Sequence, residues 1–155
     1  MGRITKAELE CMDLEWFAID KKGQVAVFCS AGVANVPEFV CSDEDRTNEL
    51  MELFDMLSNV SEVELCFEES ISNSGSVKVA NDFSKKGLYY FDSDDNSRKK
   101  DNIASFQEYY TINSRPLKPV VYNELPTRIK ELMKDNILEI EDFSKETVIK
   151  VTNAY

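Results

Sequence analysis

Residues 15–29, EWFAIDKKGQVAVFC, decide the fold of this chain. Two apolar runs, 15–20 and 24–29, flank the short polar sequence Lys21-Lys22-Gly23. Runs of this length that are rich in aromatic and β-branched residues are typical of strands, and a glycine supplies the positive φ that a tight turn needs. The stretch therefore predicts two strands joined by a tight turn, which is a β-hairpin.

A helix is predicted to follow this hairpin. Ser42 is a suitable N-cap, and Asp45 stands three residues later, as in a capping box. Apolar side chains then recur at i, i+3, i+4 and i+7, which places them on one face of a helix. These residues are Leu50, Leu53, Phe54 and Leu57.

The rest of the chain alternates between short strands and short helices. Strands are expected over 63–67, 88–91, 106–112 and 147–151, helices over 77–86 and 128–135, and an exposed loop over 92–102. Gly87 is suited to end the first of these helices. The 155 residues suffice for one core. We predict a single α+β domain over 1–155, with a mainly antiparallel sheet and two or three helices packed on it.

The negative charge is concentrated in one segment. The formal net charge is −11, and residues 38–70 hold eleven acidic residues against a single base, Arg46. Such a field disfavours nucleic acids and anionic membranes, and it speeds encounters with cationic proteins. Acidic residues also serve only to keep many proteins soluble, which is the plainer interpretation.

We predict that this segment binds a basic protein partner. The expected contact residues are Asp43, Glu44, Asp45, Glu49, Glu52, Asp55, Glu62, Glu64, Glu68 and Glu69. Tyr109, Tyr110 and Tyr122 are candidate aromatic anchors, because tyrosine is favoured at interfaces. Trp16 lies in the early apolar strand and is expected in the core.

The sequence offers little catalytic chemistry. It contains no histidine, the commonest general base and a common metal ligand, and its five glycines do not form a phosphate-binding loop. The stretch 92–96 resembles the opening of a calcium loop, but Ser97 and Ile103 stand where that loop needs Gly and Glu. We predict no enzymatic activity, no metal and no cofactor.

Cysteines and hydropathy indicate the compartment. The four cysteines are Cys11, Cys29, Cys41 and Cys66, and none forms a close pair, which favours inert thiols in a reducing environment over a disulfide. The N-terminal residues lack the apolar run of a signal peptide, and no stretch is apolar enough to span a membrane. A soluble, cytoplasmic protein is expected.

Several short stretches together resemble a family of small bacterial proteins, some of which are presumed immunity proteins of polymorphic toxin systems. The stretches are 13–20 (DLEWFAID), Gly23, 27–32 (VFCSAG), Pro37, 87–92 (GLYYFD), 110–112 (YTI), 115–117 (RPL) and 124–126 (ELP). The resemblance implies a toxin-binding role and carries over no catalytic residue.

The leading hypothesis is an immunity-type protein that neutralises a basic toxin domain through its acidic segment. The alternative is a structural or regulatory interaction module, such as a homodimer, without a toxin partner. A hydrolase that uses two carboxylates is the third hypothesis, and it requires a deep acid-lined cleft.

Overall fold

The hairpin at residues 15–29 forms as predicted. In the computed structural model, which describes residues 2–66, 75–93 and 106–155, strand β1 (Glu15–Ile19) pairs antiparallel with β2 (Val25–Cys29). Gly23 has a φ of 81° in the connecting turn, a value that favours glycine. The side chains of the two strands alternate between the faces of the sheet, and they are almost all buried.

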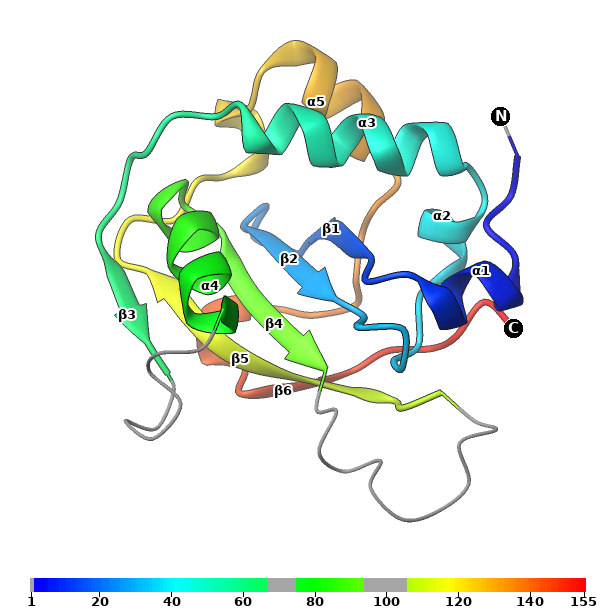
Figure 1. The fold of residues 1–155 in the computed structure, drawn as a ribbon. Helices are drawn as coiled ribbons and strands as arrows, with labels where there is room; N and C mark the ends of the chain where they lie inside the picture. Colours follow the sequence, from blue (N-terminus) through cyan, green and yellow to red (C-terminus); the bar gives the residue numbers. More distant parts are fainter. Residues whose placement is uncertain (1, 67–74, 94–105) are drawn as a thin grey trace.

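The hairpin belongs to a six-stranded, mainly antiparallel sheet (Figure 1). The order is β1-β2-β4-β5-β3, and β6 also pairs with β5. Among the six strands of the described residues, β2 pairs parallel with β4, and the other strand pairs are antiparallel. The remaining strands are β3 (Val63–Leu65), β4 (Tyr89–Ser93), β5 (Tyr109–Pro116) and β6 (Val148–Lys150). The predicted α+β class is confirmed.

The described residues form five α-helices, more than the two or three predicted. They are α1 (Lys6–Cys11), α2 (Glu38–Cys41), α3 (Glu44–Asp55), α4 (Gly75–Lys85) and α5 (Thr127–Met133). Two 3-10 turns, η3 (Tyr122–Glu124) and η4 (Phe143–Lys145), complete the elements. The unexpected helices, α1 and α2, are too short to show a periodic apolar pattern.

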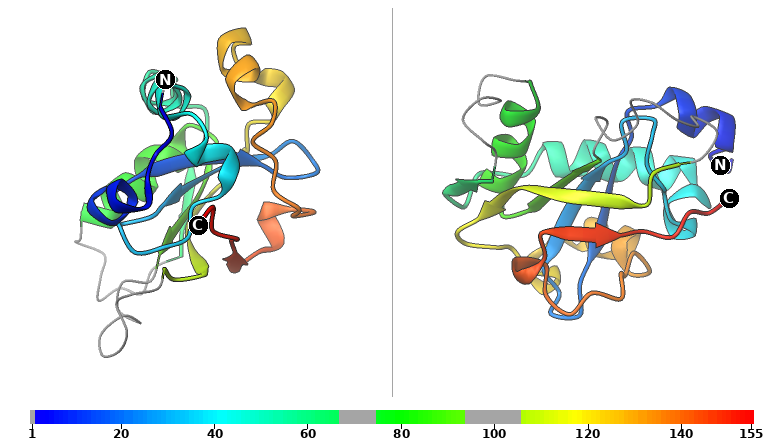
Figure 2. Two further views of the ribbon diagram at one scale, coloured as in Figure 1. Left: turned by 90° about the vertical axis from the view of Figure 1, so that its right-hand side faces the viewer. Right: turned by 90° about the horizontal axis from the view of Figure 1, so that it is seen from below.

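Alternation along the hairpin divides the core into two clusters, one on each face of the sheet. Figure 2 shows the sheet and the helices around it from two further sides. Trp16 and Phe28 belong to a cluster with side chains of α1, α2 and η4. Phe17 and Val27 belong to the other cluster, with side chains of α3, α4 and α5. Both faces of the sheet are therefore covered.

Gly87 closes α4 in the way the sequence predicts. Its φ is 91°, and a Cβ atom there would lie 2.8 Å from the backbone nitrogen of Val120. The position thus needs glycine both for its backbone conformation and for the close approach of the neighbouring chain. This turn leads α4 directly into β4.

The structure corrects three local predictions. The helix expected from Ser42 is capped by Asp43 instead, and Ser42 ends α2. The strand expected over 106–112 runs over Tyr109–Pro116. The strand expected over 63–67 runs over Val63–Leu65, and Leu65 is 45% exposed on this short edge strand. The loop predicted over 92–102 lies mostly outside the described residues.

Candidate protein-binding surface

Helix α3 carries most of the predicted binding residues. The side chain of Asp43 accepts a hydrogen bond from the backbone N–H of Arg46 at 3.1 Å and so caps the helix. Leu50 and Phe54 are buried as the apolar spacing predicts, and the Phe54 ring stacks on Phe17 with a centroid distance of 4.2 Å. The inner face of the helix is thereby fixed to the sheet.

The outer face of α3 displays carboxylates. Asp45, Glu52 and Asp55 are exposed, whereas Glu44 and Glu49 are half-buried. Asp45, Glu49 and Glu52 follow one another at i, i+4 and i+7, so they share one side of the helix. In Figure 1 this helix runs across the upper part of the molecule, next to α5. We call Asp43, Glu44, Asp45, Glu49, Glu52 and Asp55 the α3 acids.

The remaining predicted residues do not join the α3 acids on one helix. Glu62 and Glu64 are exposed, just before and within β3. In Figure 1, β3 stands at the left edge of the molecule, away from the top surface of α3. Glu68 and Glu69 lie outside the described residues. The described acids thus divide into the α3 acids and a pair beside β3.

An arginine from a distant part of the chain neutralises the middle of α3. Arg128 of α5 donates two hydrogen bonds to the Glu49 carboxylate, at 2.7 and 2.8 Å. These bonds lower the pKa of Glu49 below its usual value. Glu64 is also close to a cation, since its carboxylate lies 3.8 Å from the Arg115 guanidinium. The acidic segment is therefore partly compensated.

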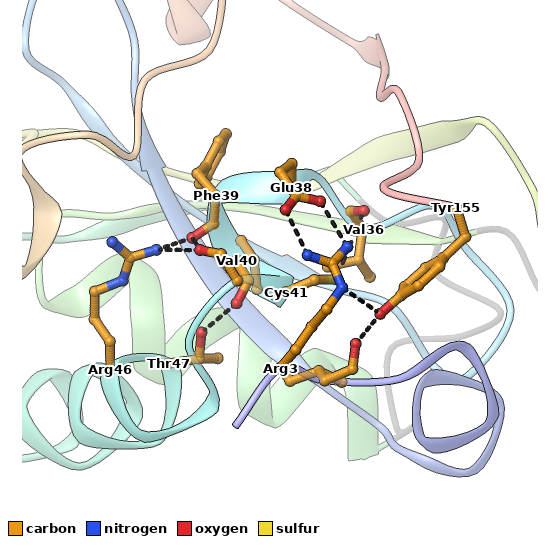
Figure 3. Close-up of polar contacts among 11 residues, drawn as sticks. Arg3, Val36, Glu38, Phe39, Val40, Cys41, Arg46, Thr47 and Tyr155 are labelled. Carbon is orange, nitrogen blue, oxygen red and sulfur yellow. Dashed lines mark hydrogen bonds and ion pairs between the residues drawn. The ribbon is translucent and has the colours of Figure 1, made fainter. Parts of the chain in front are cut away.

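Four acids of the segment have no such compensation. Within the described residues, no cationic side chain lies within ion-pair distance of Glu44, Glu52, Asp55 or Glu62. Arg46 is the one base among residues 38–70. Its guanidinium donates to the carbonyl of Phe39, as Figure 3 shows, and it also donates to the Ser42 hydroxyl at 3.3 Å. This arginine bonds to the end of α2 and makes no ion pair with Glu44, Glu52 or Asp55.

A polar clamp holds α2 at the start of α3 (Figure 3). The Arg3 guanidinium donates to both oxygens of Glu38, at 2.5 and 2.6 Å, and to the Tyr155 hydroxyl at 3.0 Å. The Tyr155 hydroxyl in turn donates to the carbonyl of Ile4. The pKa of Glu38 is lowered, chiefly by its hydrogen bonds with Arg3. The clamp thus joins the segments at residues 3–4 and 155 to α2. Glu38 is the acid of residues 38–70 that was not predicted to contact a partner, and its role here is structural.

A small groove adjoins the outer face of α3. It has a volume of about 170 Å³ and is lined by Glu15, Asp55, Val79, Asp82, Phe83 and Lys86. Burial raises the pKa of Glu15, and the nearby carboxylates of Asp13 and Asp55 raise it further. Lys86 also lines the groove, and its ammonium donates to the carbonyls of Phe54 and Asp55. The groove thus brings three carboxylates and one ammonium together between α3 and α4.

A larger hollow, of about 400 Å³, lies at the hairpin turn and is lined largely by residues 19–23 and 121–123. Its two lysines are engaged: Lys21 with Glu139 and Glu141, and Lys22 with Asp142. Across residues 2–66, 75–93 and 106–155, no group of three or more side chains could hold a metal ion. None of the helices in those ranges is long and apolar enough to cross a membrane.

The aromatic and cysteine predictions are borne out unevenly. Trp16 is in the core, as predicted, at 1% exposure. Tyr110 is wrong as an interface anchor, because it is fully buried and its hydroxyl donates to the carbonyl of Asn35 at 2.7 Å. Tyr109 is exposed, and Tyr122 is half-buried. All four cysteines are free, and Cys11 is the exposed one.

Sequence reasoning missed several uncovered apolar side chains, which lie at the end of α3, in and before β3, and just after β5. Met56 is 79%, Val60 50% and Leu117 60% exposed, together with Leu65. Met56 and Val60 lie outside the periodic stripe of α3, and this departure is the signal that could have identified them.

Searches of protein-family models, curated proteins and solved structures gave no significant match to this chain.

Proposed function

We propose that this protein is a non-catalytic binding protein of the immunity type, which neutralises a basic toxin domain by covering it. The α3 acids provide the first contact. The supporting observation is the outer face of α3, where Asp45, Glu52 and Asp55 are exposed and the nearest base in sequence, Arg46, is turned to the backbone of α2.

Electrostatics favours a cationic partner for this face. Carboxylates held on one rigid helix act together, and a field of one sign raises the association rate with an oppositely charged protein. Helix α3 is held in place at two points. Its Phe54 ring stacks on Phe17 of the sheet, and the clamp of Arg3 and Glu38 fixes α2 next to the first turn of α3. Because Glu49 is already paired with Arg128, we expect Glu52 and Asp55 to contribute most to steering.

Affinity capture followed by kinetics tests the proposal. The wild-type protein, immobilised at low salt, should retain a basic protein from the native lysate, which mass spectrometry identifies. The association rate of that purified protein should fall about tenfold or more for Glu52→Lys/Asp55→Lys, and it should fall for the wild type as salt rises to roughly 0.5 M.

A matched control separates local charge from net charge. Glu10→Lys/Glu108→Lys makes the same change in net charge at exposed positions in α1 and just before β5, away from α3. We expect this control to associate at nearly the wild-type rate. Equal slowing in both double variants would refute a role for the α3 face. Capture of no basic protein, together with a stable dimer by light scattering, would favour the alternative of an interaction module without a toxin.

A further inference from the structure

Strand β3 has one side free of backbone partners among the described residues. Its inner side pairs with β5, where Leu117 N–H donates to the carbonyl of Glu62 at 2.9 Å and Cys66 N–H donates to that of Asn113 at 2.8 Å. In an antiparallel pair, alternate residues direct their backbone groups to opposite sides. The N–H and C=O groups of Val63 and Leu65 therefore point away from β5.

The free side of β3 lies at the margin of the molecule. No described residue pairs with it, since β3 pairs only with β5 and takes part in no isolated bridge. Figure 1 shows β5 on its inner side. An edge of this kind can accept an additional strand, and proteins use this mode to bind extended peptides.

Uncovered apolar side chains occur on and near this strand. Leu65 is 45% exposed on the strand itself, Val60 is exposed three residues before it, and Leu117 is exposed on its β5 side. Leu117 is adjacent to the strand because its backbone N–H bonds to Glu62. Apolar side chains that remain uncovered in a group mark interaction sites more often than single exposed residues do.

Charge decides which chain can occupy the edge. Glu62 and Glu64 are exposed at β3, and the compensation of Glu64 by Arg115 is loose, at 3.8 Å. A second copy of this strand would bring glutamates against glutamates across the new pair, and like charges opposite one another destabilise a sheet. A lysine- or arginine-rich segment would place cations there instead.

We infer that the free side of β3 takes up an extended basic segment of the partner as an added strand. The inference rests on the proposed function and names the part of the partner that binds. Cationic residues of the added strand lie opposite Glu64, and apolar residues lie opposite Val63 and Leu65, so the segment alternates between cationic and apolar residues.

The same sheet provides an internal comparison. Strand β6 also pairs with β5 alone among the described residues, and the bonds of residues 147 and 151 to β5 direct the backbone groups of Val148 and Lys150 outward. Val148 is 47% exposed, much like Leu65, but its neighbour on the edge is a lysine. A basic segment therefore has no electrostatic reason to join β6.

A synthetic octapeptide of alternating lysine and valine, with an octapeptide of alternating glutamate and valine as its counterpart, tests the inference. Binding is measured by fluorescence polarisation and by hydrogen exchange of the ¹⁵N-labelled protein. We expect the lysine peptide to bind and to protect the amides of Val63 and Leu65. Leu65→Pro removes an outward N–H and should weaken binding about tenfold, whereas Val148→Pro should leave it unchanged.

Leu65→Lys keeps the backbone intact and should also weaken binding, so the test does not depend on the folding of a proline variant. Undiminished binding to both Leu65 variants would overturn the inference. If the lysine peptide bound these variants and its binding still required Glu52 and Asp55, the proposed function would stand without the added strand. Equal binding of the glutamate peptide would also overturn the inference. A wild-type dimer that Leu65→Pro dissociates would overturn the inference as well, since a second copy would then occupy the edge.

Discussion

Removal of the Phe54 side chain should release α3 from the sheet. The ring is fully buried and lies nearly parallel to Phe17, with an interplanar angle of 14° and centroids 4.2 Å apart. Truncating a buried Phe to Ala costs about 3–5 kcal/mol. A stacked pair adds about 0.5–1.5 kcal/mol beyond simple burial, so Phe54→Ala belongs in the upper part of that range. A loss of this size is a large fraction of the stability of an ordinary domain, which is about 5–15 kcal/mol.

Urea unfolding followed by tryptophan fluorescence measures this loss. Trp16 is the only tryptophan in the chain and is buried against Phe28, with ring centroids 4.2 Å apart, so its emission reports on the core. For Phe54→Ala the urea midpoint should fall while the slope of the transition stays unchanged. The melting temperature should fall by roughly 6–20 °C for a chain of this length.

Val60→Ala is the matched control, because Val60 is half exposed in the segment that follows α3. Its effect should stay within about 0.5 kcal/mol. A loss below about 1 kcal/mol for Phe54→Ala would refute the reasoning, since a fully buried ring whose removal costs so little cannot hold the helix. The α3 acids would then lack the rigid support on which the proposed function depends.

Three further outcomes are expected. The Ser144 hydroxyl, with other donors, holds the pKa of Asp142 well below its usual value, so the stability from this carboxylate should be present above about pH 4 and lost as pH falls further. Urea midpoints at several pH values should therefore decline less steeply in acid for Asp142→Asn. Tyr110→Phe should cost about 1–3 kcal/mol in thermal unfolding, because its buried hydroxyl bonds to a backbone carbonyl and to the Trp16 indole at 3.2 Å. Alkylation of the folded protein, followed by mass spectrometry, should modify Cys11 first, since it is the exposed cysteine.

The central hairpin and α3 could be predicted because their signals are local. Two apolar runs on either side of a glycine turn indicate a β-hairpin, and the spacing of Leu50 and Phe54 determines the inner face of a helix. Helix α1 was also within reach. Thr5 and Glu8 form a capping box, which is a readable start signal, although only six helical residues follow it.

The extension of β5 was not predictable from the prolines nearby. Pro116 suggests a turn, but it lies opposite Val63 at a position where the ladder with β3 needs no N–H. The ladder bond is made one residue later, by Leu117 to Glu62. Only the register between the two strands shows that the proline is tolerated there, and register is a tertiary property.

The negative charge of the candidate site was predictable from the sequence, but the cations that pair with its carboxylates were not. The acids at i, i+4 and i+7 could be assigned to one side of α3 from spacing alone. The pairing of Glu49 with Arg128 spans 79 positions of the chain, and no local pattern indicates it. The exposure of Leu65 depends equally on tertiary structure, because alternation predicts which face a side chain takes and not whether another element covers it.

The fold itself restricts where a partner can bind. Both faces of the sheet are filled by core clusters, so a partner must bind elsewhere, for example at the outer faces of helices or at the edges of the sheet. The edge at β1 is partly closed: Ile19 N–H donates to the carbonyl of Asn136 at 2.8 Å, and Leu138 N–H donates to that of Ile19 at 3.0 Å. No described segment closes β3 in this way. The chain thus closes the sheet edge at β1 and leaves the edge at β3 free beside exposed glutamates. This difference is better explained by an external strand that binds at β3 than by chance.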